Sequence, residues 1–224
     1  MSYIEVKDLN YTIDNQKILK NINIKINKGE YVAFVGSSGS GKSSLFRIIG
    51  NLSLPSSGEI YFKGKNYLDY DPIELRKHIH YSFQNPHLFK YTVRDNLVYP
   101  FSIKKKEIDK NLISKLLNDF MLGEEFIEKK INGLSGGEIQ RVALIRSLLS
   151  NPDIILLDEV TSALDSKNKN IVNKVISNFN KAGRTVLFIS HDVEEARKYA
   201  SRIIEVSNGE IIKDEVIKNA NAIN

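Results

Sequence analysis

The stretch that decides the fold is Tyr31-Val32-Ala33-Phe34-Val35-Gly36-Ser37-Ser38-Gly39-Ser40-Gly41-Lys42-Ser43. Its first five residues form a continuous apolar run, which predicts a strand buried on both faces. A glycine- and serine-rich segment follows. From Lys42 to Leu52 the spacing of Leu45, Ile48 and Ile49 predicts a helix. The succession of buried strand, loop and helix indicates the beginning of an α/β domain.

The loop in this stretch has the pattern of a phosphate-binding site. Residues 36–43 match G-x-x-x-x-G-K-[ST] at every fixed position. Glycines let the backbone approach a phosphate closely, and the amides at the start of the following helix supply a positive field. Lys42 would reach the β- and γ-phosphates, and the Ser43 hydroxyl would bind Mg²⁺. We therefore predict a nucleotide site here rather than a flexible linker.

A second stretch, Ile154-Ile155-Leu156-Leu157-Asp158-Glu159, predicts a buried strand that ends in two carboxylates. Open α/β sheets bind their ligands at the carboxyl ends of their strands. Asp158 is therefore predicted to hold Mg²⁺, and Glu159 to orient and deprotonate an attacking water.

The rest of the chain continues the α/β pattern. Residues 4–26 and 59–62 alternate apolar and polar side chains, which predicts antiparallel strands near the N-terminus. From about Pro72 to Asn132 the pattern is helical. Helices over 138–149, 168–181 and 193–199, a strand over 185–189 and a final hairpin around 207–209 then predict a mainly parallel sheet.

Composition excludes several classes of protein. Of 224 residues, 42% are hydrophobic and 26% charged, too much apolar content for a disordered chain. The apolar runs are far shorter than the roughly 20 residues that cross a bilayer, and the N-terminus resembles no secretory signal. There is no cysteine, which is compatible with the cytosol. The net charge of +5 and the short run Lys104–Lys106 indicate solvated surface rather than a nucleic-acid site.

The segment Leu134-Ser135-Gly136-Gly137-Glu138, followed by Gln140-Arg141, is the most specific feature. Ser135 and two glycines at the start of a helix predict a second anion site, and Ser135 with Glu138 also fits a capping box. This segment is similar to the signature of the nucleotide-binding subunits of ATP-binding cassette (ABC) transporters. The resemblance implies an α/β P-loop NTPase of the ABC ATPase type, with a mainly parallel sheet core, an N-terminal antiparallel β region and an inserted helical subdomain.

The same resemblance assigns roles to further residues. Tyr11 resembles the aromatic residue that stacks on adenine, and Gln84 the lid glutamine that senses Mg²⁺ and the attacking water. Ser162–Asp165 resembles the loop that crosses the dimer, and His191 the switch histidine at the γ-phosphate. The implied cofactors are ATP and Mg²⁺. ATP would be bound by Tyr11 and by two segments, namely Gly36, Ser37, Ser38, Gly39, Ser40, Gly41, Lys42, Ser43 and Ser44, and Ser135, Gly136, Gly137 and Glu138.

The resemblance also implies an organisation and a set of partners. Residues 1–84 and 134–224 would form the catalytic core of a single domain, and about 85–133 the helical subdomain. The partners would be a second copy of the chain, in a homodimer that sandwiches two ATP, and a separate multi-span membrane subunit. The chain would then lie on the cytoplasmic face of the membrane as a peripheral subunit, with no nucleic acid involved.

Within the family, the chain resembles the small FetA/YbbL-type iron-export ATPases. The residues that carry this resemblance are Val160, which stands where many members have proline, the run Thr161–Asp165 with Asn168-Lys169, and Leu88–Leu97. An importer subunit, a lipid- or peptide-type exporter subunit and a permease-free regulatory ATPase are the alternatives. A small-molecule kinase has no use for the 134–138 segment, and the chain lacks the long heptad arms of chromosome-structure ATPases.

Overall fold

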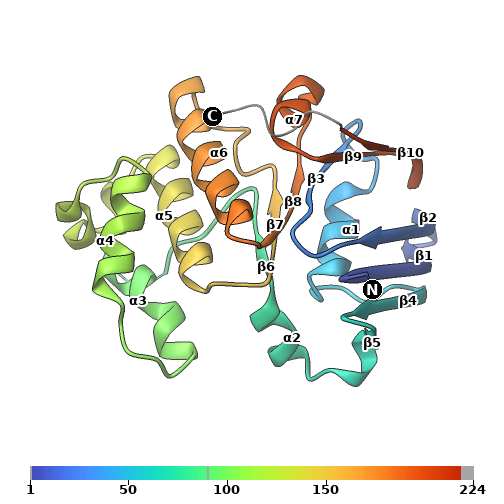
Figure 1. The fold of residues 1–224 in the computed structure, drawn as a ribbon, viewed down its shortest axis with the longest axis horizontal. Coiled ribbons are helices and arrows are strands. Elements are labelled where there is room, and N and C mark those ends of the chain that lie inside the picture. The colour runs from blue at the N-terminus through green and yellow to red at the C-terminus, as the bar shows by residue number, and fades with distance from the viewer. Residues whose placement is uncertain (1, 90, 218–224) are drawn as a thin grey trace. The chain divides into compact units, whose positions relative to one another are not determined.

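The computed structural model describes residues 2–89 and 91–217, and the chain divides into two compact units (Figure 1). The first unit comprises Met1–Tyr81, Asp153–Glu159 and Phe179–Asn224, and the second comprises Ser82–Pro152 and Val160–Asn178. This division differs from the expected one, in which all of 134–224 belongs to the catalytic core. Packing groups the stretch 134–152 with the second unit because its helix lies against the helices that precede it.

The N-terminal part of the first unit is a four-stranded antiparallel sheet, as predicted. Its strand order is β2-β1-β4-β5, with β1 at Ile4–Ile13, β2 at Gln16–Ile26, β4 at Ser57–Phe62 and β5 at Lys65–Asn66. In β1, Ile4 and Val6 are buried while Lys7 and Asp8 are exposed. Ile4 pairs with Ile26, and Val6 with Ile24, so the apolar side chains of both strands share the inner face.

The second sheet has six strands in the order β10-β9-β3-β8-β7-β6. These strands are β3 (Tyr31–Val35), β6 (Ile79–Ser82), β7 (Ile154–Asp158), β8 (Thr185–Ile189), β9 (Arg202–Ser207) and β10 (Glu210–Val216). Strands β9, β3, β8 and β7 are parallel neighbours, and β10 returns antiparallel to β9. In the register, Phe34 and Asp158 both pair with Ile189, so the carboxyl ends of β3, β7 and β8 lie at one edge of the sheet.

Helices of the first unit cover this sheet. Helix α1 (Lys42–Ile49) buries Leu45, Phe46, Ile48 and Ile49 in the main core, where the Phe46 ring meets Phe34 edge-on at 5.0 Å between centroids. Helix α2 (Pro72–His78) follows the 3-10 turn at Tyr67–Asp69. Helix α7 (Val193–Tyr199) packs on β3, where Ala33, Ala196 and Ala200 are fully buried. Small side chains at this contact let the helix approach the strand closely.

One prediction for this part of the chain was wrong. The helical pattern expected from about Pro72 onward is interrupted by β6, which is the edge strand beside β7. A strand of four residues is too short to show a period of two, and its conformation is set by pairing with a neighbour that is distant in sequence. Ile79 and Tyr81 on this strand are buried in the main core.

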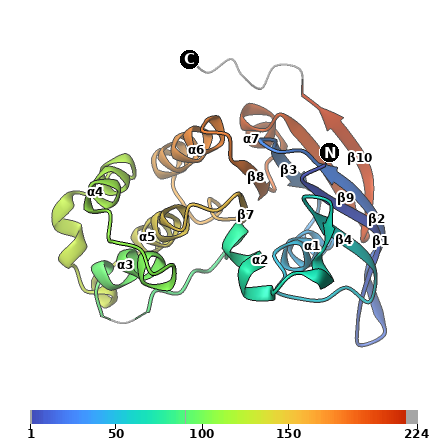
Figure 2. The same cartoon turned by 60° about the horizontal axis from the view of Figure 1, so that its bottom comes forward.

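The second unit is helical. It contains α3 (Val93–Ile103), α4 (Lys110–Asp119), α5 (Gly136–Leu149), most of α6 (Ser166–Lys181) and two 3-10 turns at Glu124–Glu128 and Ile131–Gly133. Figure 2 shows α3, α4 and α5 side by side. Capping boxes begin α3, through Thr92 and Asp95, and α5, through Ser135 and Glu138. None of the helices in the described ranges is long and apolar enough to cross a membrane.

Asp153, directly before β7, contacts three other parts of the first unit. Its carboxylate accepts hydrogen bonds from Lys63 Nζ at 3.0 Å and from Arg184 Nη1 at 3.0 Å, and it lies 2.7 Å from His78 Nδ1. Burial favours the neutral form of Asp153, but the hydrogen bonds from Lys63 and His78 outweigh it and lower the pKa of the carboxyl. The charged carboxylate therefore stabilises the folded state.

We expect Asp153→Asn to lower the free energy of unfolding by about 1–3 kcal/mol at pH 7, because hydrogen bonds to a charged group are lost. Since the pKa is lowered in the folded protein, this contribution is complete above the unfolded pKa of about 3.9 and disappears as the pH falls through the folded value. Denaturant titrations of both proteins should therefore converge toward pH 3. Asp14→Asn, at an exposed turn, is the control. An equal deficit at pH 7 and pH 3 would contradict the assignment.

Candidate functional site

The loop of residues 36–41 depends on glycine at two close approaches. Gly36 has φ +139°, and a Cβ there would lie 2.1 Å from the Val206 carbonyl oxygen. Gly41 has φ +104°, and a Cβ there would lie 2.7 Å from Leu19 Cδ2. Gly41 also precedes α1 with no side-chain cap, and the first turn of α1 carries no acidic residue. The positive end of the helix is therefore available to an anion.

The turn of the β9–β10 hairpin holds this loop from outside. The Gly209 amide donates to the Ser40 carbonyl at 3.1 Å, and the Gly209 carbonyl accepts from the Lys20 amide at 2.8 Å. A Cβ at Gly209 would lie 2.4 Å from the Ile18 carbonyl oxygen. The sequence predicted the hairpin but not this contact, which fixes the loop between β2 and the hairpin turn.

Lys42 points back into the loop. Its ammonium donates to the carbonyls of Gly36 at 2.9 Å and Ser37 at 2.8 Å, and to Ser40 Oγ at 3.2 Å. Burial lowers the pKa of Lys42, while the charges of Asp158 and Glu159 act in the opposite direction. A cation is thus held where the loop amides and the helix end would face a phosphate.

The carboxylate of Asp158 is buried and accepts hydrogen bonds from two hydroxyl groups. Ser43 Oγ donates to Oδ1 at 2.9 Å, and the Tyr81 hydroxyl donates to Oδ2. Burial raises the pKa of the Tyr81 hydroxyl, and the hydrogen bond to Asp158 raises it further. Sequence reasoning missed Tyr81, because β6 was not recognised as the neighbour of β7. Its position three residues before Gln84 was the only available signal.

Glu159 and His191 form a pair at the same edge of the sheet. Their side chains are 2.6 Å apart, from Glu159 Oε1 to His191 Nε2. Glu159 has φ +50°, a left-handed conformation that costs a non-glycine residue about 1–3 kcal/mol and that often occurs at functional sites. His191 follows β8, as predicted, and is half-exposed, whereas Glu159 is largely buried.

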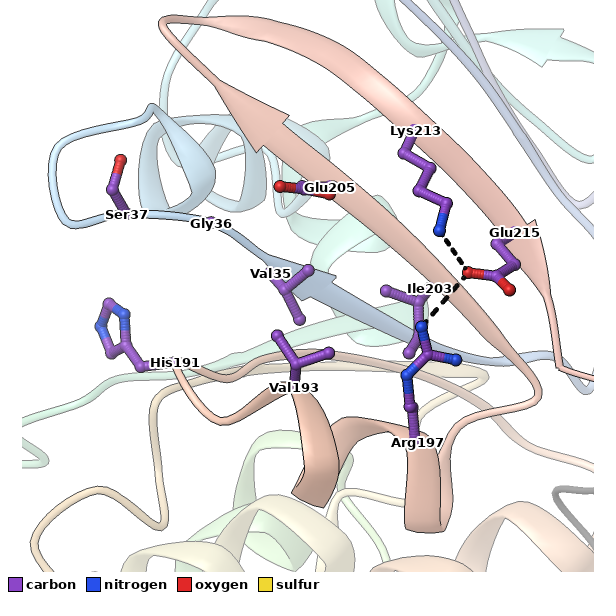
Figure 3. A pocket seen from close by; sticks show the side chains of 10 residues that line it. All are labelled: Val35, Gly36, Ser37, His191, Val193, Arg197, Ile203, Glu205, Lys213 and Glu215. Atoms are coloured by element: carbon purple, nitrogen blue, oxygen red, sulfur yellow. Dashed lines mark hydrogen bonds and ion pairs between the residues drawn. The ribbon is translucent and has the colours of Figure 1, made fainter.

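A pocket of about 310 Å³ opens beside the start of the loop. Figure 3 shows His191 and Ser37 at one end and the ion pairs of Glu215 with Arg197 and Lys213 at the other. Val35, Val193 and Ile203 form its apolar wall. The first unit therefore brings together the predicted residues 36–44, Asp158, Glu159 and His191.

The remaining predicted residues are distributed between the two units. Tyr11 lies on β1 of the first unit, pairs with Leu19 and is half-buried. Gln84 is exposed in the second unit, as are Ser135 and Gly136 at the start of α5. The Ser135 amide donates to Glu138 Oε2 at 2.7 Å, and the Glu138 amide donates to Ser135 Oγ at 3.3 Å. The hydrogen bond from the Ser135 amide lowers the pKa of the Glu138 carboxyl. The capping box is formed as predicted.

The side-chain oxygens of Ser43 and Asp158 are suitable ligands for a hard cation. Mg²⁺ prefers oxygen ligands and commonly binds through one or two protein oxygens together with nucleotide phosphates and water. The Ser43 hydroxyl and the Asp158 carboxylate are already within hydrogen-bond distance of each other, next to a loop built for phosphate. The residues present therefore fit Mg²⁺ together with a nucleotide.

Comparisons with known proteins show the family of this chain. The ABC transporter family model matches residues 19–162. The chain is 38% identical over 202 residues to the probable iron export ATP-binding protein FetA of Escherichia coli, covering 90% of this chain and 89% of that protein. It is 35% identical to the choline transport ATP-binding protein OpuBA of Bacillus subtilis, covering 91% of this chain and 56% of that protein.

A solved structure gives the same result for the fold. The dimeric post-hydrolysis state of the ATP-binding cassette MJ0796, bound to ADP and Pi, superimposes with a TM-score of 0.87 at 35% identity. The match covers 96% of this chain and 99% of that one. The chain therefore belongs to the ABC transporter family, as an ATP-binding subunit that hydrolyses ATP to drive transport.

Proposed function

We propose that ATP is bound by residues 36–44 and hydrolysed by Glu159, with His191 beside it. The observation that carries this assignment is the 2.6 Å pair of Glu159 and His191, located in the same unit as the loop, Lys42 and the Ser43–Asp158 hydrogen bond. Mg²⁺, bound through Ser43 and Asp158, would offset the charge of the phosphates.

Each side chain has a distinct part in this proposal. Lys42 donates to phosphate oxygens in place of the loop carbonyls that it now contacts. Glu159 accepts the proton of the attacking water. His191 orients the Glu159 carboxylate through Nε2 and reaches the γ-phosphate from the end of β8. Gln84 acts at the metal and the water, and Tyr11 stacks on adenine.

Glu159→Gln tests the assignment of the general base. We expect hydrolysis to slow by about 10²-fold or more, because an amide cannot accept the proton, while ATP still binds. Lys42→Ala should instead impair binding. Phosphate release and ATP titration measure the two effects, with Glu194→Gln on the exposed side of α7 as the control. Near-normal turnover of the Glu159→Gln protein would refute this role.

The second half of each ATP site is proposed to come from a second copy. Ser135, Gly136, Gly137 and Glu138 form the first turn and the cap of a 14-residue helix, and Ser135 and Gly136 are exposed. A helix N-terminus binds anions through its amides and its dipole. The similar cassette MJ0796 is described as dimeric. These observations support a homodimer that sandwiches two ATP, each between the loop of one copy and Ser135–Glu138 of the other.

In this arrangement dimerisation depends on nucleotide. We expect Glu159→Gln to be monomeric or weakly dimeric without ATP and a stable dimer with it, because ATP joins the two copies and is not consumed. Light scattering gives the mass in both conditions. Adding Ser135→Arg, which fills the exposed helix end, should abolish the ATP-dependent dimer. A mass that is the same with and without ATP would contradict the sandwich.

A membrane subunit is proposed to dock on the second unit near Gln84. Phe83, Tyr91 and Tyr99 are exposed, whereas Val93, Leu97 and Phe101 from the same stretch are core. Exposed aromatic side chains often anchor an interface.

Hydrogen bonds connect the segment that carries these exposed aromatic residues to the rest of the second unit. The buried Asn96 side chain accepts from the Phe89 amide at 3.1 Å and donates to the carbonyls of Phe89 and Thr92. Arg146 on α5 donates to Asn96 Oδ1 at 2.8 Å and to the His87 carbonyl at 3.0 Å. This network links the proposed docking segment to α5, the helix that begins at Ser135.

Metal export, with iron as the first candidate, is the proposed cargo function. Its support is the match to FetA, whose length the alignment covers almost completely. The comparable match to the choline transport protein OpuBA favours import of a small organic cation as the alternative. The chain would act at the cytoplasmic face of the membrane through its partner. Transport assays with the co-purified membrane subunit, comparing iron with choline, would decide between the two.

Tyr91→Glu tests the docking surface. The Tyr91 side chain is 82% exposed, so the charge should leave folding and basal ATP hydrolysis intact while it weakens co-purification with the membrane partner and transport. Met121→Glu, at an apolar side chain that is 70% exposed in the same unit, is the matched control. Normal binding and transport by the Tyr91→Glu protein would place docking elsewhere.

A further inference from the structure

The carboxylate of Asp158 has a hydroxyl donor on each oxygen. Ser43 Oγ donates to Oδ1 at 2.9 Å and the Tyr81 hydroxyl donates to Oδ2. The carboxylate cannot turn about its Cβ–Cγ bond without breaking one of these bonds. It is also enclosed, since Asp158 is only 5% exposed.

The two donors differ in what happens to them when a cation binds. Ser43 has a single hydroxyl, and its oxygen must face the cation if it is to act as a ligand. The hydrogen bond from Ser43 Oγ to Asp158 can therefore lengthen or break when the cation binds. Tyr81 is not a candidate ligand, so its bond to Oδ2 can persist in both states.

The surroundings of Tyr81 fix the direction of its hydroxyl. The side chain is 8% exposed and belongs to the main core cluster with Leu156 and Ile49. Gly50, at the end of α1, is so close that a Cβ there would lie 3.4 Å from Tyr81 Cδ2 and 3.2 Å from Leu156 Cδ1. Strand β6 is the neighbour of β7 in the sheet. The hydroxyl is therefore aimed at the end of β7 by packing rather than by the hydrogen bond alone.

We propose that Tyr81 is a positioning residue for the metal–nucleotide site, which holds the Asp158 carboxylate in the orientation that binds Mg²⁺ together with Ser43. This inference rests on the proposed assignment of Mg²⁺ to Ser43 and Asp158. Groups that orient a metal ligand from behind commonly change metal affinity about 10- to 100-fold when they are removed. The effect of losing the hydroxyl should therefore appear in metal affinity and not in binding of the nucleotide itself.

Tyr81→Phe removes the hydroxyl and retains the ring. The matched control is Tyr67→Phe, since Tyr67 packs against the same core and its hydroxyl donates to the Ile49 carbonyl at 2.9 Å. Two quantities are measured with a non-hydrolysable ATP analogue. The first is the affinity of the analogue in EDTA, and the second is the affinity of the protein–analogue complex for Mn²⁺, followed by electron paramagnetic resonance. Thermal unfolding is recorded for each variant.

We expect Tyr81→Phe to lower Mn²⁺ affinity about 10- to 100-fold and to change analogue affinity in EDTA by less than about 2-fold. Tyr67→Phe should leave both quantities unchanged. In a double-mutant cycle with Asp158→Asn, the two losses of metal affinity should not add, because both act on one carboxylate. Tyr81→Met, a second side chain without a hydroxyl, carries the same expectation if Tyr81→Phe does not fold.

Three results would overturn the inference. One is wild-type Mn²⁺ affinity in Tyr81→Phe, and another is an equal loss of analogue affinity with and without metal. The third is failure of both Tyr81 variants to fold, which would make the hydroxyl a structural group. If the wild-type protein shows no metal-dependent binding of the analogue, the metal site itself is misassigned.

Discussion

The site depends on the parallel register of β3, β8 and β7. Phe34 and Asp158 pair with the same residue, Ile189, so these three strands end together. The loop after Val35, the Asp158-Glu159 pair and the Ser190-His191 pair are consequently placed at one edge. A shift of one residue in β7 or β8 would turn the side chains of that strand to the opposite face and would separate Glu159 from His191.

Close contacts then hold the phosphate loop in one conformation. Gly36 lies against the Val206 carbonyl and Gly41 against β2, while Gly209 in the hairpin turn bonds to both the loop and β2. A loop of glycine and serine would otherwise be flexible, and fixing it on binding would cost conformational entropy. In this structure the neighbouring strands have already fixed it. The hairpin of β9 and β10 therefore supports the proposed nucleotide site, although it contributes none of the predicted ligand residues.

Much of this could be predicted from the sequence, because local patterns carried the information. Continuous apolar runs identified β3, β7 and β8, alternation identified β1 and β2, and the G-x-x-x-x-G-K-[ST] pattern identified the loop. Strand β6 could not be predicted from its four residues, since its conformation comes from pairing with β7. For the same reason the contact of Tyr81 with Asp158 was invisible, as was the role of Gly209. Both depend on which segments become neighbours in space. Among the apolar and aromatic residues after Gln84, only their burial distinguishes the core residues Val93, Leu97 and Phe101 from the exposed Tyr91.

A crystal structure with a non-hydrolysable ATP analogue and Mg²⁺ would test the proposed site most directly. We expect the triphosphate within residues 36–43, the metal at Ser43 and Asp158, and Lys42 Nζ on phosphate oxygens. Lys42 would then have left the carbonyls of Gly36 and Ser37, which it contacts at 2.9 and 2.8 Å. A triphosphate bound outside the loop, with these two Lys42 contacts unchanged, would contradict the account.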